Sequence, residues 1–323
     1  MRVFVTGATG FIGSAIVNEL IANGHDVLGL ARSEASGEKL RRAGARVQVG
    51  TVEDLDCLRK AAGSADGAIH TAFYHKISHI PPRARLGIFL GGAPRNIIQR
   101  FMGAAVAADR AAIETIGQSL KQSGGPLVAT FGTLGMKPGR LATEDQSYDP
   151  EFIGALRART EDVLQTLAAQ GVRTSAVRLP PSVHGAGDHG FVAELIKIAR
   201  KKNQSAYVGD GRNRWPAVHR IDAARLFRLA LENGPAGGTY HGIAEEGIPF
   251  RDIAELIGSR LSVPAAGISP ENASKHFGFL GPFVSIDNPA SSALTQERLD
   301  WKPTQPTLFE DLETQDYFSQ PER

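Results

Sequence analysis

The fold follows from the first residues of the chain, Met1-Arg-Val-Phe-Val-Thr-Gly-Ala-Thr-Gly-Phe-Ile-Gly13. A short apolar strand runs directly into three glycines, and a helix is predicted from Ile12 to about Asn23. Gly7 permits a tight turn off the strand, Gly10 lets the backbone approach a pyrophosphate, and Gly13 allows close packing of helix and strand. The helix N-terminus turns its N–H groups and positive dipole end to the phosphates. The stretch therefore predicts nucleotide binding.

The end of the second predicted strand, His25–Ala31, indicates which nucleotide is bound. An NAD site usually places an acid there to hold the ribose hydroxyls, whereas this chain has Arg32 and Ser33, and Asp26 lies at the wrong end of the strand. Arg32 can stack on adenine and pair with a 2′-phosphate, and Ser33 can add a hydrogen bond. The pair Arg41-Arg42 can add positive field. The alternative is that Arg32 is an ordinary solvated cation; NADP(H) is the prediction.

The composition is that of a soluble enzyme. The chain has 323 residues, 42% of them hydrophobic and 22% charged, and its net charge of +2 gives no argument for a nucleic acid or an anionic membrane as partner. The single cysteine, Cys57, rules out an intrachain disulfide and fits a reducing cytosol. No apolar run reaches membrane-spanning length, and no signal segment precedes the first core strand. We expect a cytoplasmic protein with a small-molecule substrate.

Strands and helices alternate through the first half of the chain. Beyond the segments above, strands are predicted at 46–50, 67–71, 126–131 and 172–179, and helices at 54–62, 105–123 and 152–170. Such alternation implies right-handed crossovers and a parallel sheet with both faces covered. The predicted fold is therefore α/β, a Rossmann-type doubly wound parallel sheet.

The alternation ends after residue 179, which suggests a second, smaller part. We predict a dinucleotide-binding domain at 1–179, to which 217–245 return, and a discontinuous C-terminal substrate-binding lobe made of 180–216 and 246–323. The segment from residue 249 on is predicted as short helices and loops that form a lid. The long connection 74–104 leaves the carboxyl end of the fourth strand, where ligands bind in open α/β sheets. It is predicted to form part of the substrate pocket; the alternative is a surface excursion or an oligomer contact.

With these residues, the chain resembles the extended short-chain dehydrogenase/reductase superfamily, in its NAD-dependent epimerase/dehydratase branch. The resemblance rests on the motifs Thr6-Gly-x-x-Gly-x-x-Gly13, Ile69-His-Thr-Ala72, Arg178-Leu-Pro-x-x-Val-His-Gly185 and Val218-His-x-x-Asp222-Ala-Ala. It implies that Thr71, Ala72 and Val183 lie near the nicotinamide. The predicted cofactor-binding residues are Gly7, Thr9, Gly10, Phe11, Ile12, Gly13, Arg32, Ser33, Thr51, Val52, Thr71, Ala72, Pro180 and Val183. The superfamily often dimerises through the helices that correspond to 105–123 and 152–170, so a homodimer is possible.

The tyrosine and lysine that the superfamily uses for proton transfer are absent here. In the superfamily, a glutamate often stands four residues after the lysine. Aligning Glu161 with that glutamate places Arg157 at the lysine position and Ile153 at the tyrosine position. The nearest tyrosine, Tyr148, is followed four residues later by Phe152. The resemblance therefore points to an atypical member. Arg157 cannot act as an acid, but it can hold a ribose or a developing oxyanion.

Several residues could replace the missing tyrosine. The superfamily's Ser/Thr position falls at Thr130 or Thr133, with Thr133 preferred. Tyr148 could supply the proton, as could a histidine near neutral pH. The other candidates for the proton donor are Tyr74, His75, His184, His189 and His219. For each of them, the alternative to catalysis is a structural role. The predicted catalytic residues are Thr133, Tyr148, Arg157 and His184, with no metal site, because the histidine spacing fits no compact ligand motif.

The leading functional hypothesis is an NADP(H)-dependent reductase of a small hydrophobic carbonyl, imine or activated alkene, with a nonstandard proton donor. An apolar pocket is expected from Phe73, the connection 74–104, Trp215 and the segment Phe277–Phe283. A second hypothesis is a catalytically inactive NADP(H)-binding sensor or regulatory protein, which would also keep the glycine loop. A third, a nucleotide-sugar epimerase or dehydratase, is weakened by the missing tyrosine.

Overall fold

The computed structural model describes residues 1–75, 77–91, 96–152, 154–314 and 317–319. The chain divides into two compact units, which we call unit 1 and unit 2. Unit 1 consists of Met1–Phe131, Ile153–Val177 and Phe227–Thr239, and unit 2 of Gly132–Phe152, Arg178–Leu226 and Tyr240–Arg323. Among the described residues, no helix combines the length and the apolar character that crossing a bilayer demands.

The division differs from the predicted one in two places. Residues 132–152 belong to unit 2, although they directly follow a strand of the central sheet, and the segment that returns to unit 1 is 227–239 instead of 217–245. The first difference has a backbone cause. The amide of Gly139 donates to the carbonyl of Asp287, and Ala142 exchanges hydrogen bonds with Pro289 and Ser291. These long-range bonds attach the segment to the C-terminal part of unit 2.

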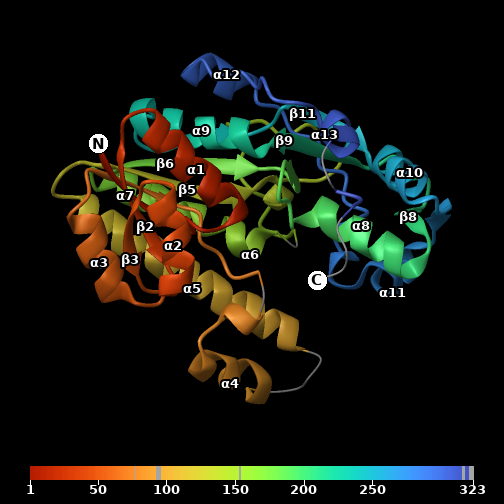
Figure 1. The fold of residues 1–323 in the computed structure, drawn as a ribbon, viewed down its shortest axis with the longest axis horizontal. Helices are drawn as coiled ribbons and strands as arrows, with labels where there is room; N and C mark the ends of the chain where they lie inside the picture. Colours follow the sequence, from red (N-terminus) through yellow and green to blue (C-terminus); the bar gives the residue numbers. More distant parts are fainter. Residues whose placement is uncertain (76, 92–95, 153, 315–316, 320–323) are drawn as a thin grey trace. The chain divides into compact units, whose positions relative to one another are not determined.

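A seven-stranded sheet, built mostly from unit 1, has the order β10-β6-β5-β4-β1-β2-β3, and Figure 1 labels its strands β2, β3, β5 and β6. Its strands are β1 (Arg2–Thr6), β2 (Asp26–Ala31), β3 (Arg46–Val49), β4 (Gly67–His70), β5 (Pro126–Gly132), β6 (Arg173–Leu179) and β10 (Gly238–His241). β1 pairs in parallel with β2 and β4, and β2–β3 and β4–β5 are also parallel. The chain thus winds outward from β1 in both directions, which confirms the Rossmann-type α/β prediction. The order reverses beside β1, where such sheets bind ligands.

Helices pack on this sheet within unit 1. They are α1 (Phe11–Ala22), α2 (Glu34–Arg42), α3 (Leu55–Gly63), α4 (Pro82–Leu90), α5 (Ile97–Leu120), α6 (Ala155–Ala158) and α7 (Glu161–Ala169), and α9 (Arg220–Asn233) ends in this unit. α5 lies beside α3 and α7. A Cβ at Gly117 would lie 2.4 Å from the Leu167 side chain, so the glycine lets α5 and α7 approach closely. The buried face of α5 contributes Ala112, Ile113 and Ile116 to the core.

Two predicted features of unit 1 differ from the structure. The helix predicted over 152–170 is interrupted between α6 and α7, because the amides of Thr160, Asp162 and Val163 bond to carbonyls three residues earlier, as in a 3₁₀ turn. Ile153, the residue at the tyrosine position, lies outside the described residues. The connection 74–104 contains a 3₁₀ turn (Ile77–His79), α4 and the first turns of α5, which begins before the predicted residue 105.

Unit 2 is built on two small sheets, β11-β9-β7 and β12-β8. Their strands are β7 (Ser182–His184), β8 (Ser205–Val208), β9 (Arg214–His219), β11 (Glu245–Pro249) and β12 (Ala265–Ile268); the helices are α8 (Phe191–Lys202), α10 (Phe250–Leu261), α11 (Ala273–Phe277), α12 (Ala293–Leu299) and α13 (Leu308–Thr314). α8, α10 and β8 pack together (Figure 1). Their core includes Trp215, whose ring centroid lies 4.9 Å from that of Phe250. The segment from residue 249 on, predicted as short helices and loops, thus also contains the strand β12.

Candidate functional site

The three glycines between β1 and α1 have the geometry of a phosphate-binding turn. Gly7 has φ +69°, and a Cβ there would lie 2.5 Å from Thr71 Oγ1. A Cβ on Gly13 would lie 2.0 Å from the Gly7 carbonyl oxygen, so only a glycine lets α1 start this close to the turn. At Gly10 a Cβ would meet only that same oxygen, at 3.1 Å, and the residue is exposed. The backbone at Gly10 is therefore open to a ligand on the side where a side chain would stand.

The start of α1 adds the electrostatics that a diphosphate needs. Gly10 is the N-cap and supplies no side-chain hydrogen bond to the helix, and the first turn contains no acidic residue. The first amides of a helix have no partner within the helix and lie at its positive dipole end. Together with the open backbone at Gly10, this arrangement fits the pyrophosphate of a nicotinamide dinucleotide.

The end of β2 contains no acidic side chain. Arg32 is exposed, and among the described residues no carboxylate forms an ion pair with it. Ser33 is the N-cap of α2, where its hydroxyl accepts from the Ser36 amide. Asp26 lies at the opposite end of β2 and is held by Arg46 at 2.7 Å. An accessible cation thus occupies the place of the usual ribose-binding acid.

One residue of the basic pair Arg41-Arg42 is already engaged in ion pairs. Arg41 pairs with Glu34 and Glu38, so much of its charge is already balanced.

Thr51 is half-buried after β3, and Val52 is buried. Thr71, at the end of β4, donates its hydroxyl to the carbonyl of Thr6 at 2.9 Å, which fixes the strand end that faces Gly7.

Tyr74, one of the alternative proton donors, is engaged within unit 1. Its hydroxyl donates to the carboxylate of Glu53, a residue that the sequence did not single out. Burial, reinforced by Glu53, raises the pKa of Tyr74 far above its ordinary value. A phenol in this state is a poor acid near neutral pH. Its place beside the segment after β3 suits a wall of the nucleotide site better than catalysis.

Arg157 occupies a defined position at the carboxyl end of the sheet. Its Nη2 donates to the carbonyl of Thr130 at 2.9 Å, and its guanidinium carbon lies 4.0 Å from the ring centroid of Phe73. Its Nε lies 3.7 Å from the buried carboxylate of Asp109. Neither Asp109 nor its partner His70 was predicted from the sequence, because a lone acid in a helix carries no signal of burial.

The structure separates the two threonines that were considered for the Ser/Thr role. Thr133, the preferred one, is fully buried in unit 2, where its hydroxyl donates to Asn288 Oδ1 at 2.7 Å. Asn288 Nδ2 donates in return to the Thr133 carbonyl at 2.9 Å. The Thr130 hydroxyl, in unit 1, has no hydrogen-bond partner among the described residues. Thr130 is therefore the better placed of the two to bind a ligand.

His184 belongs to a buried cluster in unit 2. Its Nδ1 lies 2.8 Å from Asp311 Oδ2, and both side chains are almost completely buried. The His219 ring lies 5.4 Å away, edge-on. Burial, followed by the charge of His184, lowers the pKa of His219. His184 Nε2 is buried without a hydrogen-bond partner in the described part of the chain.

Four further predicted residues lie in unit 2. Tyr148 is half-buried in an irregular segment, and His189 is exposed with its Nδ1 3.3 Å from the Gly187 carbonyl. Pro180 is buried just after β6, and Val183 is half-buried in β7. Across the described residues, no three His, Cys, Asp or Glu side chains converge as metal ligands.

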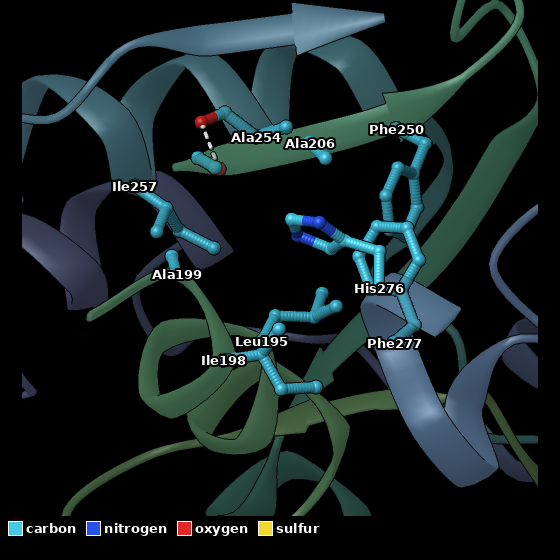
Figure 2. Close-up of a pocket in the computed structure, with 10 residues that line it drawn as sticks. Leu195, Ile198, Ala199, Ala206, Phe250, Ala254, Ile257, His276 and Phe277 are labelled. Atoms are coloured by element: carbon cyan, nitrogen blue, oxygen red, sulfur yellow. Dashed lines mark hydrogen bonds between the residues drawn. The ribbon is translucent and has the colours of Figure 1, made fainter. Parts of the chain in front are cut away.

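Described residues of unit 2 line a small and a large cavity. In the smaller, Figure 2 shows the His276 ring among apolar side chains that include Leu195, Ile257 and Phe250. Its volume of about 10 Å³ leaves room for one water molecule at most. Burial lowers the pKa of His276, whose Nε2 has no partner among the described residues. This is a packing gap, too small for a substrate.

The larger cavity has a volume of about 720 Å³, the size of a small-molecule site. Phe277 and Phe279 from the predicted apolar segment line it, together with basic residues that include Lys197 and Lys275. Its wall thus combines apolar and basic side chains with the acidic Asp188 and Glu194, the latter paired with Lys197. Trp215 has no exposed surface and does not line it, so its predicted role in the pocket is not what the structure shows.

Comparisons with known proteins agree with this fold. Residues 3–80 match the NAD dependent epimerase/dehydratase family. The chain is 48% identical to the uncharacterized protein C2A9.02 of Schizosaccharomyces pombe, over 98% of this chain and all of the relative. It is 27% identical to the 4-hydroxy-2-methyl-3-oxo-4-farnesyl-3,4-dihydroquinoline-1-oxide ketoreductase of Stigmatella aurantiaca, over 87% of this chain and 80% of that protein.

A solved structure shows the same arrangement. The dTDP-glucose 4,6-dehydratase DesIV of Streptomyces venezuelae, crystallised with NAD bound, superposes with a TM-score of 0.74. It is 19% identical, and the superposition covers 97% of this chain and 94% of that chain. At this identity the likeness establishes the fold and does not carry the substrate across.

Proposed function

Since this chain belongs to the NAD-dependent epimerase/dehydratase family, we propose that it is an NADP(H)-dependent reductase with a nonstandard proton donor. One observation carries the choice of cofactor. Beside a glycine turn that fits a pyrophosphate, the end of β2 presents the exposed Arg32, with no ion-pair partner among the described residues, where an NAD site has an acid. A guanidinium recognises a phosphate with two parallel hydrogen bonds.

The proposed substrate is a small hydrophobic carbonyl, imine or activated alkene. The ketoreductase of Stigmatella aurantiaca supports this class, because its name describes a 3-oxo compound with a farnesyl group. Phe277 and Phe279 in the large cavity of unit 2 offer apolar surface. The lysines on the same cavity would also tolerate an anionic group on the substrate.

The proposed chemistry divides the roles among a few residues. NADPH, when bound, would supply the hydride for reduction of the substrate. Arg157 holds the ribose or stabilises the negative charge that develops on the acceptor oxygen. The Thr130 hydroxyl is the proposed second hydrogen-bond donor, in preference to Thr133. Tyr148 is the proposed proton donor, because His184 and Tyr74 are both buried and held by carboxylates.

A binding titration of the purified protein with NADPH, NADP⁺, NADH and NAD⁺ tests the proposal. NADPH is expected to bind at least about tenfold more tightly than NADH, because a charge-assisted hydrogen bond contributes about 1.5–3 kcal/mol. Arg32→Ala should weaken NADPH binding far more than NADH binding and so remove this preference. Arg46→Ala is the matched control, since Arg46 pairs with Asp26 at the far end of β2.

Three outcomes would count against the proposal. Equal affinity for NADH and NADPH in the unmodified protein would remove the 2′-phosphate argument and leave an NAD-dependent enzyme. Binding of NADPH without turnover of any carbonyl, imine or enone would favour the NADP(H)-binding sensor. Absence of binding to all four dinucleotides would contradict both.

A further inference from the structure

A chain of buried polar side chains links two neighbouring strands of unit 1, β1 and β4, to α5. Thr6 and His70 are the last residues of β1 and β4, and Thr6 Oγ1 lies 2.8 Å from His70 Nδ1. His70 Nε2 lies 3.1 Å from Asp109 Oδ1, in the middle of α5. All three side chains are at most 2% exposed. An ionised carboxylate can only accept, so Nε2 must carry a hydrogen and donate it to Asp109.

Asp109 connects this chain to Arg157. Its second oxygen, Oδ2, lies 3.7 Å from Arg157 Nε, and neither atom has a hydrogen-bond partner in the described part of the molecule. A buried carboxylate needs a nearby positive charge, since removing it from water without one costs several kcal/mol. Arg157 is the cation that the structure places against it. The pair is therefore a buried charge and its counter-charge.

Three contacts determine how the guanidinium of Arg157 lies. Asp109 holds Nε, the Thr130 carbonyl accepts from Nη2 at 2.9 Å, and the Phe73 ring covers one face at 4.0 Å. The recorded contacts within the described residues leave Nη1 without an acceptor, and the side chain keeps 22% of its surface exposed. A lysine could not reproduce this arrangement, because its single ammonium cannot both stack on a ring and bond in two fixed directions.

We propose that Asp109, supported by His70, is a positioning residue that fixes Arg157 so that Nη1 binds the nicotinamide-side ribose of the dinucleotide. The inference rests on the proposed NADP(H) binding. Thr6 and His70 end strands that flank the glycine turn, so the cation is fixed to the same frame as the phosphate site. A carboxylate–arginine pair thus takes the place of the family's lysine. Asp109 itself does not touch the ligand.

The test is a double-mutant cycle read out as NADPH affinity. Asp109→Asn keeps the shape of the side chain and the bond from His70 but removes the charge that holds Arg157. Asp109→Asn and Arg157→Met should each weaken NADPH binding about tenfold, and the double variant should lose no more than either single one, since both remove the same contact. Adenosine 2′,5′-bisphosphate, which lacks the nicotinamide ribose, should bind all three as it binds the unmodified protein.

Two further variants separate positioning from folding. Arg110→Ala changes the residue after Asp109 in α5, an exposed arginine paired with Glu114. It should alter neither the affinity for NADPH nor the affinity for adenosine 2′,5′-bisphosphate. Arg157→Lys keeps the buried charge compensated, so it should fold even if Asp109→Asn does not, and still lose about tenfold in NADPH affinity.

Three results would overturn the inference. They are additive losses in the double variant, an equal loss of adenosine 2′,5′-bisphosphate binding, or full NADPH affinity in Arg157→Lys. Each would make the Asp109–Arg157 pair purely structural. Failure of the proposed function looks different, because the unmodified protein would then bind neither NADPH nor the bisphosphate.

Discussion

Adding one methyl group to the glycine turn tests the geometry of the nucleotide site. In Gly13→Ala the new Cβ would lie 2.0 Å from the Gly7 carbonyl oxygen, about 1 Å inside the closest approach that Cβ atoms show. Both groups belong to the backbone, so α1 and the turn have to move apart. Overpacking of this kind costs about 1–3 kcal/mol, and a backbone contact belongs near the upper limit.

The net effect follows from two opposing terms. Alanine favours a helix by about 1 kcal/mol over glycine, which leaves a loss of about 2 kcal/mol in the free energy of unfolding. Such a loss lowers the melting temperature by roughly 3 °C in a protein of 323 residues. Differential scanning fluorimetry with and without NADPH measures it.

Gly10→Ala is the matched variant. Gly10 has φ −78°, which any residue adopts, and its Cβ would approach only the Gly7 oxygen, at 3.1 Å. Stability should change by less than about 1 kcal/mol, because the lost N-cap preference and the reduced freedom of the unfolded chain oppose each other. NADPH affinity should nevertheless fall at least about tenfold, since the methyl group occupies the side where the pyrophosphate approaches.

Gly13→Ala is thus expected to lose stability, and Gly10→Ala is expected to lose NADPH affinity. A Gly13→Ala protein that melts within about 1 °C of the unmodified one would show that the turn relaxes at no cost. A Gly10→Ala protein that binds NADPH normally would show that the phosphates do not lie against this backbone. Either result would refute the assignment of the turn.

Three further predictions concern unit 2. Burial, followed by the charge of Arg178, lowers the pKa of His241 to about 3, so below its ordinary value of 6.5 the unfolded chain binds a proton that the folded one does not. The free energy of unfolding should therefore fall as the pH drops below about 6.5. In urea unfolding at about pH 5 and 7, His241→Gln should make this fall smaller. An unchanged dependence of the free energy of unfolding on pH would assign the fall to other groups. Asp222→Asn should lower the free energy of unfolding by about 3 kcal/mol, because the buried carboxylate accepts from the Thr304 and Gln305 amides and pairs with Arg225. NADPH affinity should stay unchanged. A specific loss of NADPH affinity would contradict this structural role. With an accepted substrate, Tyr148→Phe should lower kcat at least about a hundredfold, as expected for a general acid, and an unchanged kcat eliminates Tyr148.

The central sheet and the phosphate turn could be predicted because their signals are local. Glycines spaced by three residues between a strand and a helix, and the regular alternation that follows, reflect backbone geometry over short distances. The residue at the end of β2 is equally local, so Arg32 could be identified without coordinates. The helix over 152–170 was predicted as continuous, because the change at Thr160 to hydrogen bonds three residues apart leaves no mark on the pattern of apolar residues.

The side chains that could do chemistry depend on contacts between distant parts of the chain. Thr133 looked like a suitable hydroxyl until Asn288, far along the sequence, was found to engage it. Trp215 looked like a pocket wall but is packed in the core of unit 2.

The sequence by itself determined the fold class, the dinucleotide turn and the cation at the end of β2, because each depends on neighbouring residues. Only the tertiary structure decided which polar groups are buried and what compensates them. Asp109 is an ordinary acid in a helix until the fold places it against His70 and Arg157. The reason is that desolvation and Coulomb interactions act through space, so the properties of a charged side chain depend on neighbours that the order of residues does not reveal.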